Sequence, residues 1–136
     1  MSTIFTKIIN REIPGFFIHE DEVCVAILDK FPAVPGQALV IPKVEVDYVF
    51  DLPDDVYQHI LGVAKRVAQA LDEVFATKRT CLVIEGFEIP HVHLRLYPMT
   101  SSEEPLGAIM PQQAEASDET LTEQAEKIKA ALNTKR

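Results

Sequence analysis

Residues 90–98 decide the fold, and they read Pro90-His91-Val92-His93-Leu94-Arg95-Leu96-Tyr97-Pro98. Polar and apolar side chains alternate along this stretch, which is the period of a half-buried β-strand. Because successive strand side chains point to opposite faces, we expect His91, His93 and Arg95 in one row, with neighbours roughly 6–7 Å apart. The apolar row behind them needs a core to pack against. The pattern therefore predicts a strand over residues 91–97 that holds two imidazoles and a guanidinium rigidly.

The polar row has three interpretations: phosphate chemistry, a metal site or plain solvated surface. Two imidazoles beside a guanidinium destabilise a fold through desolvation and mutual repulsion. A functional role therefore explains this row better than a structural one. Arg95 keeps its charge and offers five donors, which suit a phosphate group. Its charge is also expected to lower the pKa of His93 and keep that imidazole neutral and nucleophilic. A His-x-His pair can begin a metal site, but Arg95 places a cation where a third ligand would stand.

The rest of the chain alternates between strand and helix patterns. Residues 4–14 predict a short helical turn that ends at a Pro-Gly pair. Apolar and β-branched runs predict strands over residues 16–19, 23–28, 37–42 and 80–85. Residues 53–75 carry apolar side chains at spacings of three and four, which is one stripe of an amphipathic helix. Strands, then a helix, then strands predict an α+β domain with a five-stranded antiparallel sheet and a central amphipathic helix.

The composition changes after the last predicted strand. Residues 100–116 are rich in Ser, Glu, Pro, Gly and Gln, which indicates a loop or an arm. Residues 117–133 return to a helical pattern and predict a C-terminal helix. We therefore divide the chain into a domain of residues 1–99 and a C-terminal loop and helix, residues 100–136. That second part is expected to pack on the domain or on a dimer partner.

The composition bounds the class of protein and its partners. The chain has 136 residues, 47% of them hydrophobic, and a formal net charge of −8, which fits one globular domain. Such an acidic surface repels extended nucleic acid, although a small anionic ligand in a local pocket remains allowed. No apolar run approaches the ~20 residues of a membrane-spanning helix, and no secretory signal opens the sequence. We therefore expect a cytoplasmic protein without a membrane partner, with Cys24 and Cys81 as buried reduced thiols.

The segment His91-Val92-His93-Leu94-Arg95-Leu96 resembles the histidine-triad (HIT) family motif, in which His alternates with hydrophobic residues three times. Further blocks resemble the family in the right order, at residues 4–14, 26–29, 35–43 and 51–52. The resemblance covers residues 4–98. It implies a HIT-like fold, usually a homodimer, that binds a purine nucleotide or a nucleotide conjugate and needs no metal or other cofactor.

The resemblance also implies roles for individual residues. His93 matches the nucleophile that attacks the α-phosphorus and forms a nucleotidyl-histidine, and His91 matches the first His, which supports the site. Asp29 matches the acidic residue that holds the ribose hydroxyls, a role that its two acceptor oxygens suit. Three apolar positions match those that sandwich the base, although such residues are equally typical of a hydrophobic core: Ile4, Phe5 and Ile8.

Several positions depart from the family pattern. Arg95 replaces the third His and can bind phosphate, but it cannot donate a proton near neutral pH. Gln37 stands where another His is often found. Glu88 lies in a shortened loop before the motif, either as a general acid with a raised pKa or as a solvated carboxylate. We include Gln37 and Glu88 among the candidate nucleotide-binding residues. Thr3 and Thr6 stand where zinc-binding relatives carry Cys, so no zinc is expected.

Two functions follow from these residues. The first is a nucleotidyl hydrolase or transferase that acts on a nucleoside phosphoramidate or a dinucleoside polyphosphate through a covalent intermediate on His93. The second is a degenerate HIT domain that binds nucleotides or a protein partner without turnover. The intact His91 and His93 favour the enzyme, whereas Arg95, Gln37 and the shortened loop favour the binding domain. A metal-binding fold outside the family is a third alternative.

Overall fold

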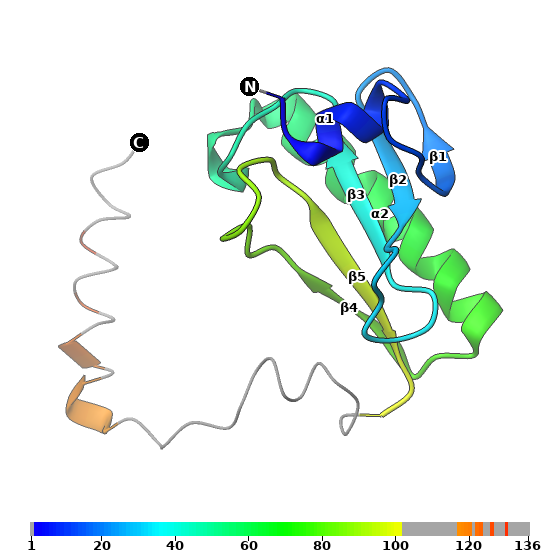
Figure 1. The fold of residues 1–136 in the computed structure, drawn as a ribbon. Helices are drawn as coiled ribbons and strands as arrows, with labels where there is room; N and C mark the ends of the chain where they lie inside the picture. The colour runs from blue at the N-terminus through cyan, green and yellow to red at the C-terminus, as the bar shows by residue number, and fades with distance from the viewer. Residues whose placement is uncertain (1, 102–116, 121, 124–125, 127–129, 131–136) are drawn as a thin grey trace.

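The computed structural model describes residues 2–101, 117–120, 122–123, 126 and 130. Within them the chain forms α1 (Ile4–Ile9), β1 (Phe17–Glu20), β2 (Cys24–Leu28), β3 (Ala38–Pro42), the 3-10 turn η1 (Val49–Asp51), α2 (Asp54–Phe75), β4 (Arg79–Val83) and β5 (Leu94–Met99) (Figure 1). The strands form one sheet in the order β1-β2-β3-β5-β4, and every neighbouring pair is antiparallel. The predicted α+β fold, with its five-stranded antiparallel sheet and its central helix, is confirmed.

Helix α2 covers one face of the sheet and runs behind it in Figure 1. Its first turn contains Asp54 and Asp55, whose charges suit the positive end of the helix dipole, and it ends at Ala76 in the left-handed conformation. Its apolar stripe is buried against inward-facing residues of β2, β3 and β5. This core cluster includes Ile60, Val63, Ala64 and Leu71 from the helix, and Cys24, Ala26, Ala38, Val40, Leu94 and Leu96 from the strands.

Helix α1 packs on the opposite face. Its buried residues Phe5 and Ile8 form a second core cluster with the outer side chains of β2 and β3, namely Val25, Ile27, Leu39 and Ile41. The central strands are therefore buried on both faces, which explains why residues 24–28 and 38–42 are nearly continuous apolar runs. Thr3 caps α1, because its side chain accepts a hydrogen bond from the backbone N–H of Thr6.

The predicted strand over residues 91–97 is shifted along the chain, because β5 begins at Leu94 and ends at Met99. Before Leu94 the chain finds other partners: the His91 ring contacts the carbonyl of Pro42, and the N–H of Val92 donates to Val46. Since the ladder with β3 stops at Leu96, the missing N–H of the later Pro98 costs no hydrogen bond to that strand. The two histidines therefore lie just before the strand instead of within it.

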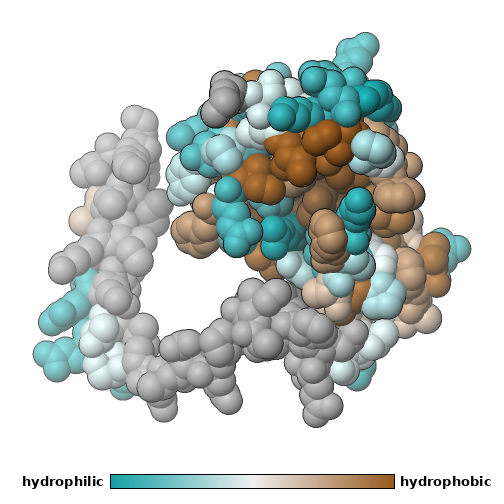
Figure 2. All heavy atoms as spheres, viewed as in Figure 1, coloured by the Kyte–Doolittle hydropathy of each residue, from teal (hydrophilic) through white to brown (hydrophobic). Residues whose placement is uncertain are grey.

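The surface retains large apolar side chains. Hydrophobic residues gather on the face seen in Figure 2, among polar ones, and the exposed large apolar residues include Phe16, Phe31 and Phe87. Among the described residues no helix is long and apolar enough to cross a membrane. Most of the predicted C-terminal loop and helix lies outside the described residues. Within the described part, Ser117 Oγ accepts from the N–H of Thr120. The division at residue 99 and the cytoplasmic location stay predictions.

Candidate active site

His93 lies immediately before β5, and one of its ring nitrogens has a hydrogen-bond partner while the other has none. The imidazole is buried, and its Nδ1 lies 2.8 Å from the backbone oxygen of His91. A carbonyl oxygen can only accept, so Nδ1 carries the proton in this pair and Nε2 carries a lone pair. Nε2 is buried without a hydrogen-bond partner. The fold thus selects the tautomer in which Nε2 is an available base.

The surroundings of His93 also keep it neutral. Burial is the largest cause that lowers the pKa of the imidazole below its ordinary value of 6.5. The hydrogen bond to His91 opposes this effect, and the charge of Arg95 lowers the pKa further. The effect predicted for the Arg95 charge is therefore confirmed, although burial is larger. His93 is a neutral, lone-pair-bearing imidazole at pH 7.

His91 is tied into a hydrogen-bond network with the N-terminus of α1. Its Nε2 lies 2.8 Å from the Pro42 oxygen and donates to it, which leaves Nδ1 to accept from the Thr3 hydroxyl at 2.7 Å. Glu45 Oε1 accepts from the N–H of Thr3 at 2.9 Å and from the hydroxyl of Thr6 at 2.7 Å. Both ring nitrogens of His91 are therefore satisfied, and its carbonyl is held where His93 needs it.

The apolar residues of α1 divide into two groups. Phe5 and Ile8 are buried, and the Phe5 ring lies 5.8 Å from the His91 ring and 4.8 Å from the His93 ring, centroid to centroid. Ile4 is 47% exposed. Phe5 therefore supports the two imidazoles from the core, and Ile4 remains open to solvent. That these residues hold a nucleotide base stays a prediction.

Arg95 extends from β5 on the same side of the sheet as His93. Burial would lower its pKa, but the hydroxyl of Tyr97 and the charges of Glu85 and Asp29 outweigh burial and raise it. Its Nη2 lies 3.6 Å from Glu85 Oε1, while its Nε is buried without a partner. Glu85 was missed in the sequence. The pairing of β4 with β5 would have indicated it: Val83 lies opposite Arg95, which places position 85 opposite position 93.

Asp29 and Gln37 are brought together by the loop before β3. Asp29 Oδ2 accepts from Gln37 Nε2 at 2.7 Å, and its Oδ1 accepts from the N–H of Phe31 at 2.9 Å. Gln37 is buried, and its own oxygen accepts from the N–H of Ala33 at 2.7 Å. Gln37 therefore orients the carboxylate, and each Asp29 oxygen keeps a lone pair for a further donor.

A cavity of about 340 Å³ reaches the site at His93. Its walls come from residues 47–50, from Leu82 and Ile84, from Glu85 and Gly86, and from Val92. The residues of the loop at 47–50 carry no motif, and the sequence did not predict them. Glu88 is exposed on the loop that follows Gly86. Glu85 lies on the wall of this cavity with His93, whereas Glu88 is not among the lining residues, and its role stays a prediction.

Two nitrogens define what this arrangement can do. In the described part of the chain, His93 Nε2 and Arg95 Nε are the buried side-chain nitrogen or oxygen atoms without a hydrogen-bond partner. Each such atom costs about 1–3 kcal/mol. One is a lone pair that can attack phosphorus, and the other is an N–H that can donate to a phosphate oxygen.

These features define a class of protein. The HIT domain family model matches residues 10–101, and the chain belongs to the HIT family. The chain is 34% identical to the adenosine 5'-monophosphoramidase HNT1 of Saccharomyces cerevisiae over 116 residues, which cover 85% of this chain and 72% of that protein. It is 29% identical to a crystal structure of a histidine triad nucleotide-binding protein from Candida albicans, with a TM-score of 0.82 and coverage of 98% and 99%. A HIT family member from Bacillus subtilis shares the fold at 23% identity, with a TM-score of 0.87 and coverage of 100% and 98%.

Proposed function

We propose that this chain is a nucleotidyl hydrolase or transferase whose nucleophile is His93. The observation that carries the proposal is the Nδ1 contact to the His91 carbonyl at 2.8 Å, which leaves a buried and unpartnered lone pair on Nε2. The substrate class is a nucleoside phosphoramidate or a dinucleoside polyphosphate. The name of the yeast relative, an adenosine 5'-monophosphoramidase, supports the first of these.

The reaction proceeds by two displacements at one phosphorus. In the first, the lone pair of His93 Nε2 forms an N–P bond with the α-phosphorus, and the bond to the leaving group breaks with its electron pair. The Nδ1–H bond to the His91 carbonyl stabilises the positive charge that develops on the ring. In the second, the oxygen of a water molecule bonds to the phosphorus, and the N–P bond breaks with its electron pair returning to His93 Nε2. One proton of the water passes to solvent, and a nucleoside 5'-monophosphate leaves with His93 neutral again.

Arg95 serves as the phosphate-binding cation of this mechanism. Its Nε–H donates to a non-bridging oxygen and stabilises the charge that grows there in the transition state. A guanidinium does not release a proton near neutral pH, so Arg95 cannot protonate a leaving group. The leaving group therefore departs as a stable anion or takes a proton from elsewhere, for which Glu88 and solvent are the candidates.

Asp29 holds the nucleoside part of the substrate in this proposal. Its two oxygens are fixed by Gln37 and by the N–H of Phe31, which orients the free lone pairs for the two ribose hydroxyls. Ile4 is exposed beside Phe5 on α1 and offers an apolar surface to a purine base. Gln37 then acts through Asp29 and does not touch the nucleotide.

A second candidate function is a HIT domain that binds nucleotides without turnover. The observation in its favour is Glu85, whose carboxylate lies 3.6 Å from the Arg95 guanidinium and lines the cavity at His93. An anion at this place repels a phosphate group and competes for Arg95. Turnover requires that the substrate phosphate displace this ion pair.

The homodimer is part of the proposal. β4 is an edge strand of the sheet, so one side of its backbone has no strand partner among the described residues, and a second copy can pair there. The exposed Leu82 is part of β4, and the exposed Phe87 lies in the loop that follows this strand. Light scattering at micromolar concentration should give twice the chain mass of 15.2 kDa, and a single-chain mass would contradict the dimer.

A substrate panel tests the function. The purified chain is incubated with adenosine 5'-phosphoramidate, with adenylates of anionic leaving groups and with dinucleoside polyphosphates, and release of the 5'-monophosphate is followed. We expect turnover of at least one class and none with His93→Ala or His93→Gln. Tight nucleotide binding by the wild type without turnover of any substrate would favour the binding domain instead.

A further inference from the structure

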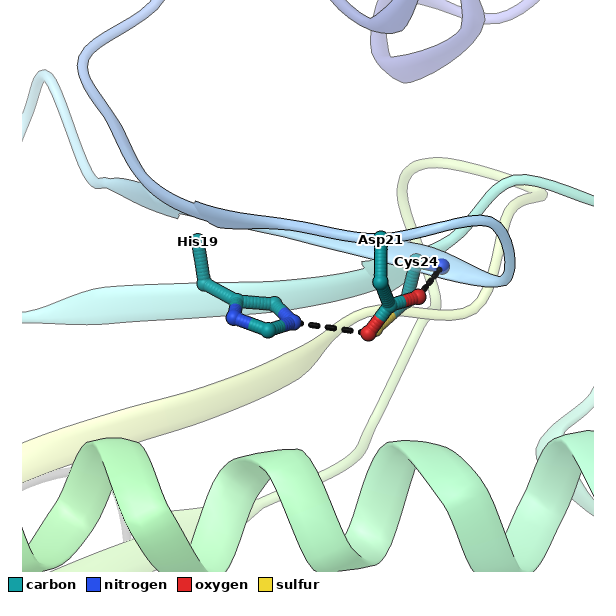
Figure 3. Close-up of side chains that lie close together, drawn as sticks. All are labelled: His19, Asp21 and Cys24. Carbon is teal, nitrogen blue, oxygen red and sulfur yellow. Dashed lines mark hydrogen bonds and ion pairs between the residues drawn. The ribbon is translucent and has the colours of Figure 1, made fainter.

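We propose a second site, a zinc site between the β1–β2 hairpin and helix α2, with His19, Asp21, Cys24 and His59 as ligands. Figure 3 shows the side chains of His19, Asp21 and Cys24 on the side of the hairpin that faces the helix. His59 reaches the same place from α2. None of these residues belongs to the nucleotide site, and the sequence predicted no metal.

The donor atoms converge on one point. His19 Nε2 lies 2.7 Å from Asp21 Oδ2, and His59 Nε2 lies 2.8 Å from the same oxygen. The Cys24 sulfur lies 3.7 Å from that oxygen as well. Donor atoms of His19, Asp21 and Cys24 all lie within 4.8 Å of one another. Three side chains thus lie around Asp21 Oδ2, which makes four potential ligands with Asp21 itself.

The carboxylate at the centre is held in place by the backbone. Asp21 Oδ1 accepts from the N–H groups of Val23 and Cys24, at 2.7 and 2.9 Å, in the turn that joins β1 to β2. These two bonds fix the rotation of the carboxyl group and point Oδ2 at both imidazoles. A fixed first ligand lowers the entropy that metal binding must overcome.

The donor set selects the metal. Two imidazoles, one thiolate and one carboxylate form a tetrahedral set typical of Zn²⁺, whose bonds are about 2.0–2.3 Å long. Such ligand atoms lie about 3.3–3.8 Å apart around one ion. The donor atoms of His19, Asp21 and Cys24 lie within 4.8 Å of one another, so these three reach that spacing after shifts of about 1 Å. His59 joins them through its 2.8 Å contact with Asp21 Oδ2. The side chains of His19, Asp21 and His59 are 32%, 25% and 37% exposed, so solvent reaches the site.

The protons balance in a simple way. Each imidazole moves its proton from Nε2 to Nδ1, which turns Nε2 from a hydrogen-bond donor into a ligand. The Cys24 thiol releases its proton to solvent as the sulfur binds the ion. Without metal, the same side chains hold the hairpin to α2 as a hydrogen-bond network. A zinc site and a hydrogen-bond network without metal differ in their affinity for Zn²⁺, so a binding experiment distinguishes them.

Cobalt provides the spectroscopic test. The full chain is freed of metal with a chelator and titrated with Co²⁺, which reports tetrahedral geometry by its d–d bands and a thiolate ligand by a charge-transfer band. We expect saturation at one ion per chain and displacement by Zn²⁺. Cys24→Ser should remove the charge-transfer band, and Cys81→Ser, the matched control on β4, should retain it. Absence of the band in the wild type, or its persistence in Cys24→Ser, would overturn the proposal.

His59→Asn is the second variant, because His59 is partly exposed on a helix and its replacement leaves the buried core intact. It should weaken Zn²⁺ binding at least tenfold in competition with a chromophoric chelator. Zn²⁺ should also raise the melting temperature of the wild type more than that of His59→Asn. Equal affinities in the two proteins would show that His59 is not a ligand and would contradict the site.

Discussion

The two faces of the sheet use histidine in opposite ways. Near α1, His93 is buried, and its protonated nitrogen contacts a backbone carbonyl. Next to α2, His19 and His59 are partly exposed, and both contact one carboxylate oxygen. A carbonyl partner on one ring nitrogen of His93 leaves the other nitrogen without a hydrogen-bond partner. A carboxylate oxygen that both imidazoles contact holds the two rings close together, and a shared metal ion requires the same closeness.

The two regions also differ in the protonation state that their surroundings favour. Burial lowers the pKa of His93, so a charge there is disfavoured. Burial would raise the pKa of Asp21, but its hydrogen bonds to His19 and His59 outweigh it and hold the pKa well below the ordinary range. The first region is thus built around a neutral base and the second around a fixed anion. The partner atoms, and not the residue type, decide the chemistry of each histidine.

Removal of the nucleophile is expected to have the largest effect. His93→Ala should reduce turnover by about 10⁴-fold or more, because attack by Nε2 occurs only in the transition state. Nucleotide binding, measured by calorimetry, should change by a few-fold at most. Zn²⁺ binding at the hairpin should not change, which would separate the two regions. Residual turnover within tenfold of the wild type would exclude His93 as the nucleophile.

Arg95 should affect both binding and rate. Arg95→Ala removes a charge-assisted hydrogen bond worth about 1.5–3 kcal/mol, so we expect affinity for AMP to fall by about 10–150-fold, with slower turnover. Arg95→His should narrow the gap between anionic and amine leaving groups, because it restores a proton donor at this position. Steady-state kinetics on both leaving groups measures that gap. An unchanged gap in Arg95→His would contradict the leaving-group argument.

Substitutions of Asp29 and of Gln37 should weaken nucleotide binding to different extents. Asp29→Ala should weaken AMP binding by about 1–2 kcal/mol, which is about 5–30-fold. Gln37→Ala should have a smaller effect, because it acts by orienting Asp29, and it should have no further effect in an Asp29→Ala background. Binding of 2',3'-dideoxyadenosine monophosphate is the control, since it lacks the hydroxyls. If the variants lost as much affinity for that analogue as for AMP, Asp29 would not contact the ribose hydroxyls.

The smallest predicted effect is a pH shift. Because the pKa of His93 lies below 6.5, the rate of nucleotidyl transfer should fall with acid at a midpoint below that value. Arg95→Gln should move the midpoint upward, since the nearby cation is removed. In the window between the folded pKa and 6.5, the unfolded chain binds a proton that the folded chain does not, so stability also falls as the pH drops. A single-turnover pH profile of both proteins measures the shift, and a midpoint above 6.5 would contradict it.

Local patterns in the sequence were enough to predict the strands and α2. The alternating motif and the apolar stripe over residues 53–75 are signals of period two and period 3.6, and both elements are present. The start of β5 was predicted three residues too early, because the Pro42 carbonyl binds the His91 ring in place of a ladder. That contact joins residues 49 positions apart, so no window of sequence contains it.

The same limit explains what was missed in the sites. Glu45 and Glu85 carry no motif. Only the packing of α1 brings Glu45 to Thr3, the partner of His91, and only the register of β4 and β5 brings Glu85 to Arg95. The histidine of α2 and the β1–β2 turn are 38 residues apart, so their cluster was not visible either. Cys24 and Cys81 were expected to be buried reduced thiols, but Cys81 is only partly buried. Cys24 is buried as expected, and the carboxylate of Asp21 and the imidazole of His19 lie near its thiol.

The covalent intermediate is the central claim, and it can be observed directly. The wild-type chain is mixed with an adenosine phosphoramidate, quenched within milliseconds at alkaline pH to preserve a phosphorus–nitrogen bond, digested and analysed by mass spectrometry. The account predicts an adenylylated peptide that contains residues 91–95, with the modification on His93, and none in His93→Gln. Turnover without any adenylylated His93, or adenylylation of a different residue, would contradict it.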